Sequence, residues 1–281
     1  MRKDYAPISS NGTVEEEIHF VERFWTERWE AHSRLPRVEG VAQREEYKMM
    51  LPFLSSLPTG SRILDAGCGM GEWTVFLTNQ GFEVVGLDVS ERTISRLRGL
   101  LPTYHFVHGD IRRMDFTEES FDACFSWGVF EHFEKGMGDC INEVHRVLKP
   151  GGWLFISVPF QNWRHILRDA QPLYRWDHTY DKRRGYTQPQ RFYQWRLTRS
   201  ELRRELELGG FHVREVKPIH KAEGVGRFLD WDFRAFRSGT LAYKLAQHFI
   251  SHILPASLIS HMILAVAHKA LRGDKCFLGT R

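Results

Sequence analysis

Several features that would assign a chain to a particular class are scarce or missing in this sequence of 281 residues. Its four cysteines, at positions 68, 124, 140 and 276, form no C-x-x-C pair, which argues against a disulfide framework and a structural zinc site. The longest block of basic residues is Lys182-Arg183-Arg184 and the formal net charge is +4, so no nucleic acid partner is expected. Residues 1–17 are polar and lack the apolar core of a signal peptide. We therefore expect a cytoplasmic protein.

Long apolar runs are also scarce. Residues 245–268 contain no Asp, Glu, Lys or Arg, and the segment is long enough to cross a bilayer. However, Pro255, several histidines and three serines dilute its apolar character. We predict an amphipathic helix, a turn at Pro255 and a second short element, and we keep contact with a membrane surface as the less favoured alternative.

A glycine-rich turn is the most informative motif that is present. Residues 62–73 have the pattern of a buried strand, a turn with glycines at 67, 69 and 71, and a helix start. A dinucleotide-binding turn, G-x-G-x-x-G, would need glycine at position 72, where this chain has glutamate. Asp65 would lie badly beside a pyrophosphate but suits an ammonium or sulfonium group. The turn therefore favours S-adenosylmethionine over NAD.

After this turn, strands and helices alternate in the rhythm that produces a parallel sheet covered on both faces. Ser90 is placed to cap a helix that ends near Leu100, and Pro150-Gly151-Gly152 is expected to stop another helix before a central strand. Strands are predicted at 62–66, 83–88, 104–108, 121–127, 153–158, 211–219 and 263–268. Helices are predicted at 72–79, 90–100, 138–148 and 198–208.

The order of these motifs resembles the class I S-adenosylmethionine-dependent methyltransferases, in particular the small-molecule group that includes the ubiquinone and menaquinone enzymes. The resemblance covers about residues 63–211 and returns at the last strand. Five of the segments that carry it, in this order, are Leu64-Asp65-Ala66-Gly67-Cys68-Gly69-Met70-Gly71, Gly86-Leu87-Asp88-Val89-Ser90, Gly109-Asp110-Ile111, Phe121-Asp122-Ala123-Cys124-Phe125-Ser126 and Leu148-Lys149-Pro150-Gly151-Gly152.

The resemblance implies an α/β, Rossmann-like sheet of seven mostly parallel strands, with helices on both faces, the last strand antiparallel and helical insertions. We expect Asp65 and the glycine turn to hold the methionine end of S-adenosylmethionine, Asp88 to accept both ribose hydroxyls, and Asp110 to accept from the adenine amino group. Alternatively, Asp88 caps the Ser90 helix and Asp110 forms a turn. The expected cofactor-binding residues are Asp65, Gly67, Cys68, Gly69, Gly71, Trp73, Asp88, Val89, Asp110, Ile111, Ser126 and Trp127.

The Glu131-His132 pair follows the fourth strand and offers a candidate base. Histidine suits the deprotonation of a phenol or an ammonium group, although a structural hydrogen bond would explain His132 equally well. Related quinone-pathway enzymes carry a metal-binding glutamate where this chain has Gly128, so we expect no metal ion. A lipid-modifying enzyme similar to the cyclopropane synthases is a minor alternative.

The acceptor is expected to be chosen by the segments around the common core. We predict a helical lid over 1–57 and a methyltransferase domain over 58–281, with insertions at 160–197 and 226–260. The first insertion carries many aromatic residues and eight Lys or Arg against three Asp, which suits an anionic, planar or sugar-like acceptor, although a solvated basic loop would look the same. Its candidate substrate-binding residues are His165, His178, Tyr180, Arg183, Arg184 and Tyr193.

Two classes of function remain open at this point. The first is O- or N-methylation of an aromatic, sugar-like or anionic small molecule, with S-adenosylhomocysteine as the second product, by a monomer or homodimer. The second is a catalytically silent protein that binds S-adenosylmethionine and serves as a scaffold or partner. The intact Asp65, glycine turn and Asp88 favour the enzyme.

Overall fold

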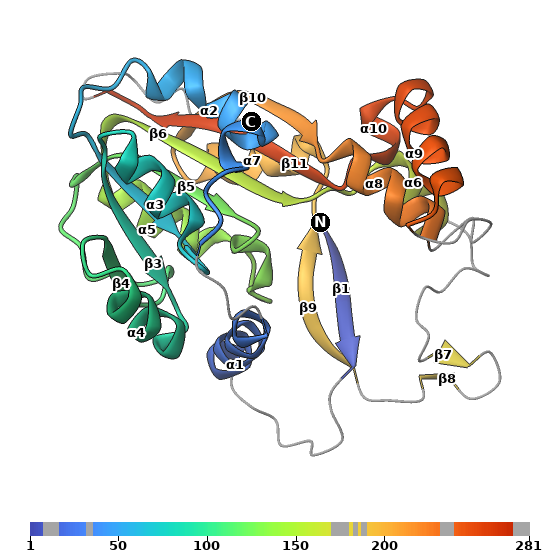
Figure 1. Cartoon of the computed structure of the whole chain (residues 1–281), viewed down its shortest axis with the longest axis horizontal. Coiled ribbons are helices and arrows are strands. Elements are labelled where there is room, and N and C mark those ends of the chain that lie inside the picture. Colours follow the sequence, from blue (N-terminus) through green and yellow to red (C-terminus); the bar gives the residue numbers. More distant parts are fainter. Residues whose placement is uncertain are drawn as a thin grey trace.

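The structure is a computed structural model and describes residues 1–7, 17–31, 36–169, 180–181, 185–186, 190–230 and 239–271. Its centre is a seven-stranded sheet in the order β10-β11-β6-β5-β2-β3-β4 (Figure 1). All neighbouring strands from β6 to β4 run parallel, whereas β11 runs antiparallel to both β6 and β10. The strands are β2 (Arg62–Ala66), β3 (Glu83–Asp88), β4 (His105–His108), β5 (Phe121–Trp127), β6 (Leu148–Pro159), β10 (Phe211–Ile219) and β11 (Met262–Lys269). The predicted fold class is confirmed.

Helices cover both faces of the sheet, and a hydrophobic core lies on each face. Successive side chains of a strand point to opposite faces and so enter the two cores in turn. In β2, Ile63 belongs to the core under α2 and α3, whereas Leu64 belongs to the core under α5 and α7. The helices around the sheet are α2 (Glu45–Leu54), α3 (Glu72–Asn79), α4 (Glu91–Leu100), α5 (Gly138–Val147) and α7 (Arg199–Leu208).

Local sequence explains where several of these helices begin. Ser90 caps α4, and its hydroxyl accepts a hydrogen bond from the Thr93 amide. Thr198 and Glu201 form a capping box at the start of α7, each side chain accepting from the other residue's backbone amide. Gly71 stands before α3 in the left-handed conformation, with φ of 75°, which a residue with a Cβ rarely adopts.

One strand is longer than predicted. Strand β6 begins at Leu148 and passes through Pro150, Gly151 and Gly152, which were expected to form a loop before a strand at 153–158. A register shift between Phe121 and Ala123 in the pairing of β5 with β6, and a φ of 78° at Gly151, show how an irregular strand absorbs these residues.

The residues before and between the sheet strands form three further groups. Strand β1 (Arg2–Pro7) pairs antiparallel with β9 (Gln190–Arg196), so part of the expected helical lid is a strand. Helix α1 (Glu17–Glu30) packs against α4, away from α2 (Figure 1). The remaining elements are the 3₁₀ turns η1 (Val41–Gln43) and η2 (Phe130–His132), α6 (Trp163–Asp169), β7 (Tyr180–Asp181), β8 (Gly185–Tyr186), α8 (Lys221–Phe228), α9 (Leu241–Ile253) and α10 (Ala256–Ile259).

The segment around Pro255 folds as predicted. It forms α9, a turn at Pro255, the short helix α10 and then β11. Within the described part of the chain, no helix combines the length and the apolar character needed to cross a membrane. Figure 1 shows α6, α8, α9 and α10 gathered at one end of the molecule.

Candidate functional site

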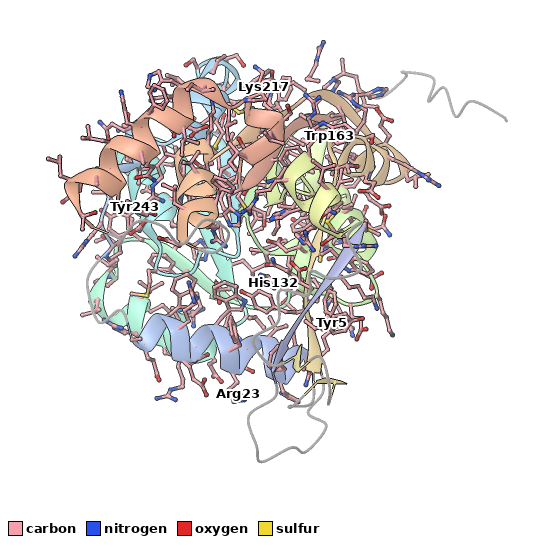
Figure 2. All side chains as sticks on the ribbon, turned by 90° about the vertical axis from the view of Figure 1, so that its right-hand side faces the viewer. Tyr5, Arg23, His132, Trp163, Lys217 and Tyr243 are labelled. Atoms are coloured by element: carbon pink, nitrogen blue, oxygen red, sulfur yellow. The ribbon has the colours of Figure 1, made fainter. Side chains whose placement is uncertain are left out.

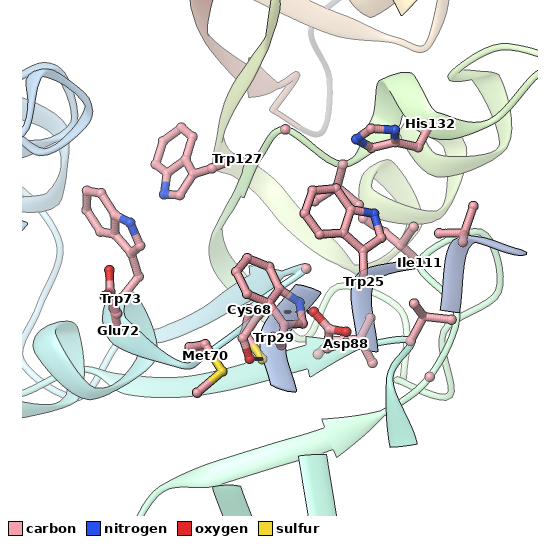
Figure 3. A pocket seen from close by; sticks show the side chains of 18 of the residues that line it. Trp25, Trp29, Cys68, Met70, Glu72, Trp73, Asp88, Ile111, Trp127 and His132 are labelled. Carbon is pink, nitrogen blue, oxygen red and sulfur yellow. Dashed lines mark hydrogen bonds between the residues drawn. The ribbon is translucent and has the colours of Figure 1, made fainter. Parts of the chain in front are cut away.

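A cavity of about 710 Å³ lies at the carboxyl ends of β2, β3 and β5, beneath α1 (Figure 3). This is the edge of an open α/β sheet where ligands bind, and the volume is in the range of small-molecule sites. The residues predicted for the site that line it are Gly67, Cys68, Gly69, Trp73, Asp88, Val89, Asp110, Ile111, Trp127 and His132. Asp65, Gly71, Ser126, His165 and Tyr193 do not line it.

The glycine turn forms the floor of the cavity. The amides of Gly67 and Cys68 both donate to the Leu87 carbonyl, at 2.8 and 2.9 Å, and this holds the turn against β3. Gly69 has φ of 51°, and a Cβ at this position would lie 2.9 Å from the ring of Trp29 on α1. The turn therefore needs glycine both for its backbone conformation and for the close approach of the indole.

Asp88 lies at the end of β3 with its carboxylate against the turn. Its Oδ2 accepts from the Gly69 amide at 2.8 Å, and its Oδ1 accepts from the Ser90 amide at 2.9 Å. Burial raises the pKa of this carboxyl. Each oxygen keeps a second lone pair, so Asp88 can stabilise the turn and accept two hydroxyl groups of a ligand.

Asp65 and Ser126 lie one layer below the cavity. Thr74 donates to Asp65 Oδ2 at 2.7 Å, and burial raises the pKa of the Asp65 carboxyl to about 7. The Ser126 hydroxyl donates to the Ala66 carbonyl at 2.6 Å. Both side chains therefore connect elements beneath the turn, and the geometry gives no support to a direct contact between Asp65 and a ligand ammonium group.

Asp110 faces the cavity near α1 and is paired with Arg112. Arg112 Nη2 donates to Asp110 Oδ2 at 2.8 Å, and its Nη1 donates to Glu17 Oε2 at 2.9 Å. A second contact, between the hydroxyls of Thr26 and Ser90 at 2.7 Å, holds the middle of α1. Helix α1 is thus attached to the loop that carries Asp110 and to the loop that follows Asp88.

Four indoles form much of the cavity wall. The rings of Trp25 and Trp29 on α1 are stacked, with centroids 5.3 Å apart, and the rings of Trp73 and Trp127 on the opposite wall are 5.4 Å apart. The Nε1 groups of Trp29 and Trp127 are buried and find no hydrogen-bond partner among the described residues. Buried donors are normally satisfied, so these two N–H groups are exceptions in the wall of the cavity.

His132 lies at the rim of the cavity, where the ring of Trp25 meets it edge-on with centroids 5.2 Å apart (Figure 3). Its Nδ1 is 2.8 Å from the Tyr193 carbonyl. A carbonyl can only accept, so Nδ1 carries the proton and the lone pair is on Nε2. Burial lowers the pKa of His132 to about 4, so the imidazole is neutral near pH 7.

Glu131 precedes this histidine and is enclosed by protein. Its side chain is 2% exposed, and its Oε2 has no hydrogen-bond partner among the described residues. Burial raises its pKa to about 8, so the carboxyl is protonated near neutral pH. A second acidic ligand beside it is missing at Gly128, and the described residues contain no cluster of three His, Cys, Asp or Glu suited to a metal ion.

The residues predicted to bind the acceptor are dispersed. His165 is buried within α6, with Nδ1 3.0 Å from the Phe160 carbonyl, and Tyr193 supports His132 from behind the cavity wall. His178, Arg183 and Arg184 lie outside the described residues, and of Tyr180 only the backbone in β7 is described.

Several residues that line the cavity were not predicted for the site. Arg44 lies over the ring of Trp73 at 5.7 Å and pairs with Glu72 at 2.5 Å. No local motif marks these positions; the aromatic content of α1 was the only available signal. The unpredicted lining residues are Ile18, Val21, Trp25, Trp29, Ala31, Arg37, Arg44, Met70, Glu72, Leu87, Gly109, Gly128, Val129 and Phe133.

Comparisons with known proteins agree with this geometry. Residues 63–152 match the family model described as a methyltransferase domain. An uncharacterized methyltransferase of Synechocystis is 35% identical over 43% of this chain and 57% of its own length, so the chain spans only about half of that relative. A demethylmenaquinone methyltransferase of Staphylococcus epidermidis is 28% identical over 59% of this chain and 70% of its own length.

A solved structure is similar over nearly the whole chain. The 1,6-didemethyltoxoflavin-N1-methyltransferase of Burkholderia thailandensis, crystallised with bound 1,6-didemethyltoxoflavin and S-adenosylhomocysteine, superposes with a TM-score of 0.57 and 17% identity, covering 96% of both chains. At this identity the likeness concerns the fold. Residues 63–152 are thus a class I S-adenosylmethionine-dependent methyltransferase domain, and the sheet and helices around them have the fold of that family.

Proposed function

We propose that the protein transfers a methyl group from S-adenosylmethionine to a hydroxyl oxygen of a small, planar or sugar-like molecule. The observation that carries this proposal is a single cavity with two chemically different ends. One end is formed by the glycine turn, Asp88 and Asp110, and the other by His132 with the indoles of Trp25 and Trp127.

The first end fits the cofactor. Asp88 has free lone pairs for the ribose hydroxyls, and Val89 and Ile111 offer apolar surface for adenine. For the carboxylate of the methionine end, the candidate partners are Arg37 and Arg44, which are the Lys or Arg residues among the described residues that line the cavity. Arginine binds a carboxylate through two parallel hydrogen bonds.

The second end supplies a base and an apolar enclosure. When bound, S-adenosylmethionine supplies a methyl group on a sulfonium sulfur. The acceptor oxygen forms the new bond to carbon, the sulfur keeps the electron pair of the broken bond, and His132 takes the hydroxyl proton at Nε2. A pKa of about 4 makes His132 a weak base. This suits a late proton transfer, because the hydroxyl becomes strongly acidic as its oxygen binds the methyl group.

Alignment of the acceptor is expected to contribute more to the rate of methyl transfer than the base does. Holding two reactants in line can contribute roughly 7 to 11 kcal/mol, whereas a general base adds about 10²- to 10⁴-fold. The indoles of Trp25 and Trp127 are rigid surfaces on the cavity wall that would orient a planar acceptor.

Calorimetry with S-adenosylhomocysteine, followed by methylation assays on panels of phenols, amines and sugar acids, tests the proposal. We expect binding, turnover on hydroxyl acceptors and a marked loss of kcat in His132→Gln with cofactor binding retained. Binding without turnover on any panel would favour the silent scaffold instead. Methylation of amines alone would refute the choice of oxygen.

A negatively charged acceptor is a narrower form of the proposal. It rests on the basic composition of the 160–197 insertion. Reversing the charges of Arg183 and Arg184 should then raise the acceptor KM and leave cofactor affinity unchanged. An unchanged KM would remove the anionic group from the proposal.

A further inference from the structure

Helix α9 has apolar side chains on two faces, one packed against the domain and one exposed. Its inner face packs into a small core of its own, in which Tyr243 and Ile250 meet Val225 of α8 and Ile259 of α10. Thr240 caps the helix by accepting from the Tyr243 amide. These contacts attach α9 firmly to the domain, so its orientation on the surface is fixed.

The outer face of α9 carries four large apolar side chains in the open. Leu241, Leu245, Phe249 and Ile253 are 73%, 60%, 66% and 61% exposed. They are four residues apart, so they follow one another along the same side of the helix. Single exposed leucines are common on protein surfaces, but a continuous stripe of this kind marks an interaction site.

The polar residues of α9 itself are basic or neutral, and the acidic Asp230 lies on its inner side, where it accepts from the Tyr243 hydroxyl at 3.2 Å. Lys244, His248 and His252 belong to α9 itself, and no Asp or Glu occurs anywhere in residues 239–271. Helices that lie in the surface of a bilayer combine an apolar face with Lys or Arg at its border, because the apolar side chains enter the acyl region and the cations meet anionic headgroups.

We propose that the outer face of α9 is a docking surface for a membrane that carries anionic lipids. A protein partner is less well matched, because the stripe offers carbon atoms only and an interface normally adds polar groups that fix orientation. Helix α6, which contacts α10 at the same end of the molecule, adds Trp163 and Leu167, which are 57% and 59% exposed. Figure 2 shows Trp163 on this end, well apart from Tyr243 of α9. Tryptophan is favoured at membrane interfaces, so the same end of the molecule has a second anchor.

The test is sedimentation of the full chain with two kinds of vesicle. One contains phosphatidylcholine alone, and the other contains in addition about 30 mol% of the anionic lipid phosphatidylglycerol. We expect the wild-type chain to bind the anionic vesicles. In the double variant Leu245→Ser, Phe249→Ser, the partition coefficient should fall by a factor of about ten or more. Lys244→Glu should weaken binding to the anionic vesicles and change little with phosphatidylcholine. The matched control is Leu208→Ser, because Leu208 is 67% exposed on α7, outside the stripe.

Cofactor binding, measured by calorimetry, verifies that each variant is folded. Vesicle binding needs no catalysis, so its result is independent of the proposed function. The proposal is overturned if the wild-type chain does not sediment with anionic vesicles. It is equally overturned if the double variant binds them as strongly as the control does. It is also overturned if ultracentrifugation shows a wild-type dimer that the double variant dissociates, because the stripe would then contact a second copy of the chain.

Discussion

The Glu131→Gln substitution tests whether the buried carboxyl beside His132 carries a proton. In the folded protein its pKa is raised to about 8 by burial, against a value of 4.5 for an exposed glutamate. Glutamine has nearly the same shape and presents an N–H where the acid has its O–H. The substitution therefore removes the titratable carboxyl group. It keeps the packing and a hydrogen-bond donor in the same place.

The expected effect can be worked out from proton linkage. Between pH 4.5 and about 8 the folded chain holds a proton on Glu131 that the unfolded chain has lost. The stabilising contribution is complete below pH 4.5 and is lost as the pH rises, at about 1.4 kcal/mol per unit. From pH 5.5 to 7.5 the wild type should therefore lose about 3 kcal/mol of unfolding free energy relative to the glutamine variant.

Urea denaturation followed by tryptophan fluorescence, at half-unit steps of pH, measures this difference. Glu118→Gln is the matched control, because Glu118 is exposed, and its difference from the wild type should be nearly flat. A flat difference for Glu131→Gln as well would refute the reasoning, since it would mean that Glu131 has the same protonation state in the folded and unfolded chains.

Three further outcomes follow from the site. Asp88→Ala should weaken S-adenosylhomocysteine binding by about tenfold to a hundredfold in calorimetry, because a buried, charge-assisted hydrogen-bond partner is lost, whereas Asp65→Asn should change the affinity much less. A strong loss in Asp65→Asn would mean that this carboxyl contacts the ligand. If His132 is the base, kcat/KM should stay level from pH 8 down to about 5, since its pKa is lowered to about 4; a fall centred near pH 6.5 would indicate an unperturbed histidine. Gly69→Ala should lower the melting temperature and the cofactor affinity, because the new methyl group meets the Trp29 ring and the backbone has positive φ; an unchanged affinity would show that α1 can shift freely.

The sheet could be predicted closely because its signals are local. The turn glycines, the Ser90 cap and the Thr198 capping box each fix an element boundary within a few neighbouring residues. Strand β6 was predicted too short because Pro150 and Gly151 normally interrupt a strand, and only its pairing with β5 shows that an irregular strand absorbs them. Strand β1 pairs with residues almost two hundred positions away, and no local pattern indicates such a partner.

The site was partly predictable for the same reason. Motif positions identified Asp88 and the glycine turn, which line the cavity, but the same motif also contains Asp65 and Ser126, whose side chains point into the layer below. Position in a motif does not say which way a side chain points. Arg44 and Trp29 lie within the predicted lid but were not named as ligand-binding residues, because tertiary packing brings them to the turn and the aromatic content of α1 was the only local signal.

The attachments of α1 have a kinetic consequence. One helix covers both ends of the cavity and is held by Glu17 to Arg112, by Thr26 to Ser90 and by Glu30 to Arg92. These contacts oppose any movement of α1 away from the glycine turn that Trp29 covers. We therefore expect a long residence time for S-adenosylhomocysteine, strong product inhibition, and a turnover rate that reports the release of this product more than the transfer of the methyl group.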